Sequence, residues 1–151
     1  MKQNKFRVWD SLAKKFLDEI FDVNSSSMYY FKDKLDYYNL GESSVLTDTY
    51  SHFVFQPFVN LVDTDATDIY EGDIVTCSFK HGPTDNISLG VIEFNDAYAY
   101  MGVKIIKSDM DIVGTHPKPF SNFMTIQPEF GFLIPNITII GNILENPELL
   151  E

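Results

Sequence analysis

The fold of this chain is decided by one stretch, Ile69-Tyr70-Glu71-Gly72-Asp73-Ile74-Val75-Thr76-Cys77-Ser78-Phe79. Its glycine, Gly72, permits a backbone conformation that other residues adopt only at a cost, so the chain is expected to enter a strand there through a turn. Val75, Cys77 and Phe79 then form one apolar face of the strand, because side chains alternate between the two faces of a β-strand. The stretch therefore predicts a half-buried strand.

Residues 80–105 continue the β pattern. Ile87–Phe94 is a predicted strand whose apolar face changes at Gly90, which favours a β-bulge at that glycine. Asn95-Asp96 is typical of a two-residue hairpin turn, and Ala97–Ile105 then alternates as a returning strand. With Ile74–Phe79, these segments predict three consecutive antiparallel strands, and a turn is expected over 81–86 between the first two.

The C-terminal third is predicted to contain an irregular segment followed by a strand and a short helix. Residues 107–136 contain four prolines and several phenylalanines, which indicates an irregular excursion held down by aromatic side chains. Ile137–Leu144 reads as a closing strand. Asn146-Pro147 then provides the N-cap and first-turn proline of one short terminal helix. Residues 69–144 are expected to form a barrel-like unit, although the pattern alone does not distinguish a barrel from an open sheet.

The first sixty residues predict short strands separated by polar turns. Phe6–Asp10 reads as a strand, and Leu12–Val23 as a helix, because apolar residues recur there at spacings of 4, 4 and 3. The same stretch would also fit a hairpin return. An aromatic strand over Met28–Phe31 and an irregular, mobile segment over 32–51 are expected next. His52–Gln56 is a predicted strand that Pro57 should end.

The composition indicates a folded acidic protein. The 151 residues include 11 Lys and Arg against 22 Asp and Glu, a net charge of −11, while 44% of the residues are hydrophobic. No apolar stretch approaches the roughly 18 residues of a membrane-spanning helix, and no apolar signal region follows Met1, so an intracellular soluble protein is expected.

The charge balance disfavours nucleic acid as a partner. Phosphate binding requires a basic patch, and only the N-terminal region offers one, mixed with acidic residues. Its basic residues are Lys2, Lys5, Arg7, Lys14 and Lys15. An acidic surface that mimics nucleic acid or docks on a basic partner remains open.

No pattern for catalysis or metal binding emerges. The densest carboxylate group is Asp63, Asp65, Asp68, Glu71 and Asp73, but as a calcium loop from Asp63 it lacks the required glycine and final glutamate. Three isolated histidines and one cysteine do not form a zinc site. Cys77, His81 and Asp85 are close in sequence, yet Cys77 shares the apolar face of its strand, where burial suppresses the reactive thiolate.

Two tyrosines are candidates for a contact surface. Tyr98 and Tyr100 alternate on the more polar face of their predicted strand. They fit three roles: packing beneath the aromatic excursion, binding another protein, or stacking on bases.

Three segments together resemble the YopX family of bacteriophage and prophage proteins: Phe6–Asp10, Ile69–Val75 and Ile140–Glu151. Val91–Asn95 is also similar to a family stretch, whereas the Thr-Gly and Asn-Gly turns that precede the central family motif are absent here. The residues that carry the resemblance, and that are expected to be structural, are Trp9, Tyr70, Glu71, Gly72, Asp73, Gly141, Asn142, Asn146 and Pro147.

The resemblance implies a phage-encoded, mainly β protein of the bacterial cytoplasm. It implies a C-terminal SH3-like small β-barrel over residues 61–151, including the excursion at about 107–136 and the short terminal helix. Residues 1–60 would be an N-terminal β extension with a short helix and an irregular insert. It implies no established activity.

The function expected from these observations is that of a non-enzymatic accessory protein acting through protein contacts, either with copies of itself or with a host or phage factor. A nucleic-acid-associated small barrel is the alternative, suggested by the frequent use of such folds for that purpose, and an enzyme is the third reading. No metal or organic cofactor is expected.

Overall fold

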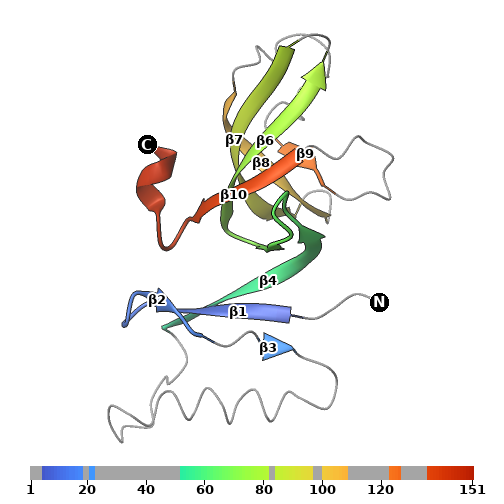
Figure 1. Cartoon of the computed structure of the whole chain (residues 1–151). Coiled ribbons are helices and arrows are strands. Elements are labelled where there is room, and N and C mark those ends of the chain that lie inside the picture. The colour runs from blue at the N-terminus through green and yellow to red at the C-terminus, as the bar shows by residue number, and fades with distance from the viewer. Residues whose placement is uncertain are drawn as a thin grey trace, which may run out of the picture. The chain divides into compact units, whose positions relative to one another are not determined.

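The computed structural model describes residues 5–18, 21–22, 52–81, 84–96, 100–108, 123–126 and 136–151. The chain divides into two compact units, Met1–Phe58 and Val59–Glu151. The described residues form two five-stranded sheets and a single 3-10 helix (Figure 1). The prediction of a mainly β protein is therefore confirmed.

The first sheet is built around strand β1 (Lys5–Asp10), which pairs with three antiparallel partners. These are β2 (Lys15–Phe16), β3 (Phe21–Asp22) and β4 (Phe53–Val62). A fifth strand, β5 (Asp68–Tyr70), follows β4 at the end of the order β2-β1-β4-β5. The sheet therefore joins the start of the chain to residues fifty positions later.

The helix predicted over Leu12–Val23 is wrong in the described residues, which form a turn and the short strands β2 and β3 instead. Asp10 explains the change, because its Oδ1 accepts hydrogen bonds from the N–H groups of Leu12 and Ala13 at 2.9 and 3.0 Å. These bonds close a tight turn and return the chain along β1, with Phe16 opposite Trp9. The hairpin return is the reading that the structure supports.

Strand β4 does not end at Pro57, as the sequence predicted, but continues to Val62. Pro57 lies opposite Phe6 of β1. A strand tolerates a proline where the ladder does not need its missing N–H.

The second sheet has the antiparallel order β10-β6-β7-β8-β9 and curls around the core (Figure 1). The three predicted central strands are confirmed: β6 and β7 are longer than predicted, and β8 runs from Tyr100 to Ser108, while residues 97–99 of its predicted span lie outside the described residues. The strands are β6 (Asp73–His81), β7 (Thr84–Asn95), β8 (Tyr100–Ser108), β9 (Phe123–Thr125) and β10 (Asn136–Asn142).

Two turns and the bulge differ from the prediction. His81 pairs with Thr84, so the first connection has only two residues, 82–83. Phe94 pairs with Met101 and Asn95 with Tyr100, so Asn95-Asp96 is not the predicted two-residue hairpin turn, and residues 97–99 lie outside the described residues. The register does shift at Gly90, but the extra residue is Ile106 of β8, because Leu89 pairs with Lys107 and Gly90 with Ile105. The bulge therefore lies opposite Gly90, not within β7.

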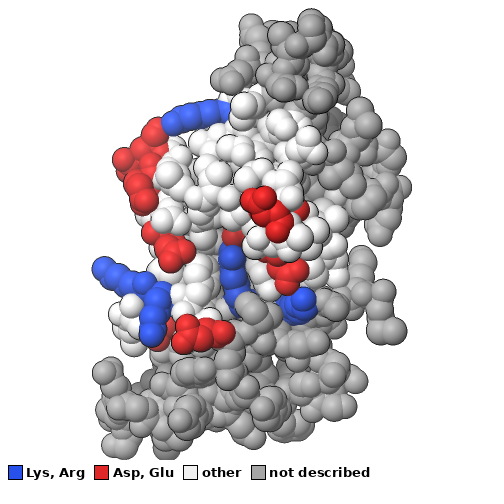
Figure 2. Space-filling view, in the orientation of Figure 1, with Lys and Arg blue, Asp and Glu red and all other residues white. Residues whose placement is uncertain are grey.

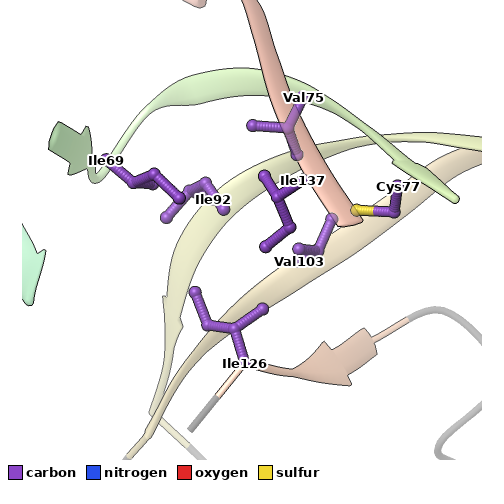
Figure 3. Packing of buried hydrophobic residues seen from close by; sticks show 7 residues of the cluster. All are labelled: Ile69, Val75, Cys77, Ile92, Val103, Ile126 and Ile137. Carbon is purple, nitrogen blue, oxygen red and sulfur yellow. The ribbon is translucent and has the colours of Figure 1, made fainter. Parts of the chain in front are cut away.

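The core of the second unit is a cluster of small and branched side chains from five strands and the residue after β9. Figure 3 shows them converging from the concave side of the sheet. The cluster contains Ile69, Val75, Cys77, Ile92, Val103, Ile126 and Ile137. Val75 and Cys77 confirm the predicted inner face of β6.

The chain closes with β10 and a short helix. Ile140 has no partner in the register between β10 and β6, which shifts between Ile139 and Gly141. The 3-10 helix η2 (Pro147–Leu150) follows a turn, so the predicted terminal helix is confirmed as a single short turn of helix. The predictions for residues 24–51 and for most of 107–136 lie outside the described residues.

Candidate functional site: carboxylate turns at two strand edges

Asp63 binds the edge of β10 with its carboxylate. Its Oδ2 accepts the N–H of Ile139 at 3.2 Å, and the N–H of the next residue, Thr64, donates to the carbonyl of Ile137 at 2.9 Å. Residues i and i+2 of a strand direct their backbone groups to the same edge. The Asp63-Thr64 pair thus takes the place of a neighbouring strand along β10.

The same carboxylate also holds its own turn together. Asp63 Oδ1 accepts the N–H groups of Asp65 and Thr67, both at 2.9 Å. Desolvation raises the pKa of Asp63, but the hydrogen bonds from Thr67, Ile139 and Asp65 outweigh it and hold the pKa below its usual value. Because these bonds favour the ionised form, Asp63 is a charged structural group.

Glu71 and Gly72 repeat this arrangement on β7. The N–H of Gly72 donates to the carbonyl of Ile92 at 2.8 Å, and the Glu71 carboxylate accepts the N–H of Phe94. The pairing between β6 and β7 ends at Ile74 and Val91. The turn at Glu71 and Gly72 therefore extends the hydrogen bonding along β7 beyond the end of β6. Gly72 has a φ angle of 84°, which explains why a glycine stands in this turn.

The electrostatic surroundings of Glu71 differ from those of Asp63. Desolvation raises the pKa of Glu71, the N–H of Phe94 lowers it, and repulsion from Glu93 and Asp96 raises it further. The net result is a raised pKa. Glu93 is close enough to the Lys104 ammonium for an ion pair, with an N to O distance of 3.4 Å.

Asp73 joins the central family-like segment to the C-terminal one. This carboxylate is fully buried. Its Oδ2 accepts the N–H of Tyr70 at 2.7 Å, and its Oδ1 accepts the Asn142 side-chain amide at 3.3 Å. The N–H of Ile143 also donates to the carbonyl of Gly72 at 2.9 Å. Two segments about seventy residues apart in sequence are therefore bonded to each other.

The remaining C-terminal motif residues shape the turn after β10. Asn146 does not cap η2 with its side chain; its Oδ1 instead accepts the N–H of Asn142 at 3.3 Å, while Pro147 begins the helix. A Cβ atom at Gly141 would lie 2.7 Å from Leu149 Cδ1 and 2.9 Å from Asn146 Oδ1. A side chain at this position would therefore require the side chains of Leu149 and Asn146 to shift.

Trp9 belongs to an aromatic contact in the first unit. Its buried ring meets that of Phe16 edge to face, with centroids 5.0 Å apart. Arg7 stacks over the same Phe16 ring at 4.6 Å and donates from Nε to Gln56 Oε1 at 2.8 Å, while Lys5 lies over the Phe58 ring. Two of the five N-terminal basic residues are therefore engaged within the protein.

The other candidate groups take different places. Cys77 lies in the core, where desolvation raises its pKa to about 12, so the thiolate is strongly disfavoured. Tyr98 lies outside the described residues, and Tyr100 is the first residue of β8. In the described part of the chain, no three His, Cys, Asp or Glu residues are grouped as metal ligands would be.

The pairing role of Asp63 and Glu71 was missed by reasoning from the sequence. Asp63 appeared there only within the acidic cluster, and Glu71 appeared in that cluster and among the family-motif residues expected to be structural. No local pattern signals this role, because every residue except proline offers a backbone N–H for pairing. The strand edges that the two residues contact are also distant in sequence, and Asp63 is 76 positions from Ile139.

These features define a class: a mainly β protein in which acidic turns complete the edges of a curled sheet. The model of the YopX protein family matches residues 5–151, and the chain belongs to that family. The crystal structure of protein EF1440 from Enterococcus faecalis is similar, with a TM-score of 0.50 and 22% identity over 97% of each chain. No curated protein matches the chain. Among the described residues, no helix is long and apolar enough to cross a membrane.

Proposed function

We propose that this protein is a non-enzymatic accessory protein that acts through contacts with other proteins. The observation that carries the proposal is that the side chains best suited to catalysis, three carboxylates and one thiol, have structural roles in the fold. Asp63, Glu71 and Asp73 accept backbone N–H groups, and burial suppresses the thiolate of Cys77.

The distribution of charge supports a protein partner over a nucleic acid. Residues 1–58 hold 7 basic and 8 acidic residues, whereas residues 59–151 hold 4 and 14, so the net charges of the two units are −1 and −10. Figure 2 shows acidic side chains spread over the visible face of the second unit. A surface of this sign repels phosphates and attracts basic protein segments.

The same proposal includes an SH3-like barrel fold, a phage or prophage origin and a cytoplasmic location. The curled sheet of five strands, with the acidic turns along two strand edges, is how an SH3-like small barrel would be closed in this chain. A phage or prophage origin and a place in the bacterial cytoplasm accord with membership of the YopX family.

Affinity capture from phage-infected cells, followed by binding assays with the purified partner, tests the proposal. We expect a protein to be retained and a direct complex to form. A fluorescence assay with duplex and single-stranded DNA at physiological salt is run in parallel. Salt-dependent DNA binding that is lost when Lys2, Lys5 and Arg7 are neutralised would favour the nucleic-acid alternative instead.

A further inference from the structure

The turn between β1 and β2 presents an apolar side chain to solvent from a rigid base. Leu12 is 74% exposed, more than any other large hydrophobic residue in the described chain. Asp10 binds two N–H groups of the turn, and Ser11 donates from both N and Oγ to the carbonyl of His52, at 3.0 and 2.6 Å. The leucine is therefore held outward by a closed network of hydrogen bonds.

Two lysines follow this leucine, at the end of the same turn and at the start of β2. Lys14 and Lys15 are exposed, and Lys14 adopts a φ angle of 51°, which is uncommon for a residue other than glycine. A positive φ angle of this kind is what a tight turn between two antiparallel strands often requires. Residues Ser11–Lys15, named here the Leu12 tip, combine one apolar side chain with two positive charges.

The C-terminal turn of the second unit offers the complementary chemistry. Ile140, Ile143 and Leu149 are exposed by 44%, 37% and 38%, although isoleucine and leucine are commonly buried. Glu145 and Glu148 are exposed beside them. A Cβ atom built at Gly141 would lie 2.7 Å from Leu149 Cδ1, and hydrogen bonds join Asn142 to Asn146, so the end of β10 and the helix η2 lie close together. These five residues are named here the C-terminal surface, and Figure 2 shows acidic side chains over the same helix.

We propose that the Leu12 tip of one molecule docks on the C-terminal surface of a second copy of this chain. This proposal rests on the proposed function, because it names one protein partner. A contact between two C-terminal units would bring together surfaces of net charge −10, whereas the tip carries the opposite charge. The contact is therefore between unlike surfaces, and repetition of it produces rings or open chains.

Light scattering after size-exclusion chromatography tests the docking over a concentration series. We expect the wild-type protein to exceed the monomer mass at about 50 mM NaCl and to dissociate at about 500 mM, where the Debye length is shorter. Leu12→Ser should shift the protein to monomer without changing its unfolding midpoint, because the side chain is already in solvent.

A charge-exchange experiment identifies the two surfaces. Lys14→Glu/Lys15→Glu and Glu145→Lys/Glu148→Lys should each be monomeric alone, and mixing the two variants should restore association. The matched control for the second variant, Asp65→Lys/Asp96→Lys, makes the same change of net charge as Glu145→Lys/Glu148→Lys at exposed residues elsewhere and should associate at least as well as wild type.

The outcomes separate this proposal from the proposed function. Restored association on mixing supports the docking. A monomeric wild-type protein, or association that survives Leu12→Ser and both charge variants, overturns it. If the protein is monomeric but retains a different partner in affinity capture, the docking fails while the proposed function stands. If it is monomeric and captures nothing, both fail.

Discussion

The turns at Asp63 and at Glu71 use the same pairing device and differ in how far the carboxylate is neutralised. In each, an acidic side chain accepts a strand N–H while the next residue donates to the carbonyl two positions earlier. Asp63 accepts three backbone N–H groups, and its pKa is lowered, whereas Glu71 accepts one, faces two carboxylates, and its pKa is raised. Desolvation raises the pKa of both carboxylates; the hydrogen bonds outweigh it at Asp63, whereas at Glu71 one hydrogen bond does not outweigh desolvation and the repulsion from Glu93 and Asp96.

Removal of the Asp63 carboxylate should have the largest effect on stability. Asp63→Ala leaves three N–H groups without their acceptor, which costs about 3 kcal/mol if each bond contributes about 1 kcal/mol. Urea denaturation at neutral pH measures the change. Asp63→Asn keeps one carbonyl acceptor and should lose less; equal losses for the two variants would contradict the bonding pattern.

Gly72→Val should have the second-largest effect and lower the free energy of unfolding by about 1–3 kcal/mol, because a β-branched residue at a φ angle of 84° is strained. The denaturation midpoint should fall while the dependence on urea stays the same. The more tolerant Gly72→Asn is the matched control and should retain much of the stability. An unchanged midpoint for the valine variant would remove this explanation of the turn.

Glu71→Gln should have a smaller effect and should raise the stability of the protein instead of lowering it. A raised folded pKa means that the stability contributed by this group is present below its usual pKa of 4.5 and falls as the pH rises through the folded pKa. Glutamine keeps an acceptor for Phe94 and removes the repulsion. The variant should therefore exceed wild type by roughly 0.5 kcal/mol at pH 7, after solvent screening.

Denaturation at pH 4 and pH 7 checks the sign. For Asp63, whose folded pKa is lowered, the contributed stability is present above the unfolded pKa and is lost as the pH falls through the folded pKa. A wild-type protein that gains stability over Glu71→Gln between pH 4 and pH 7 would contradict the contrast between the two turns.

The thiol of Cys77 should react very slowly with thiol reagents, although its strand, β6, directly follows the Glu71 turn. Its pKa of about 12 and its burial predict that a thiol reagent at neutral pH labels the native protein only through unfolding. Labelling should therefore accelerate with urea and should be faster in Asp63→Ala than in wild type. Labelling at the rate of a free thiol in the native wild-type protein would refute the burial.

Local patterns were sufficient to predict the central strands, the turn at Gly72 and the terminal helix. Each depends on alternation or on one special residue within a few positions. The spacing of Leu12, Phe16, Ile20 and Val23 was misleading, because Asp10 closes a turn that exposes Leu12 and places Phe16 on Trp9. The spacing of apolar residues contains no information about such a hydrogen bond from a turn to a side chain.

The candidate site was harder to predict because its contacts are distant in sequence. The family-like segments around Gly72 and Asn142 were recognised separately, but their joining through Asp73 depends on the closure of the sheet by β10. Asp63 and Glu71 appeared as parts of an acidic run, since their strand partners at Ile139 and Phe94 are set by tertiary packing.

Amide hydrogen exchange of Ile139 and Phe94 tests most directly the claim that the two carboxylates replace neighbouring strands. Exchange is compared in wild type, Asp63→Ala and Glu71→Ala, each normalised to amides in the middle of β6 to remove the effect of global stability. We predict selective acceleration at Ile139 in Asp63→Ala and at Phe94 in Glu71→Ala. Unchanged normalised exchange at both amides, or equal acceleration of both in either variant, would contradict the account.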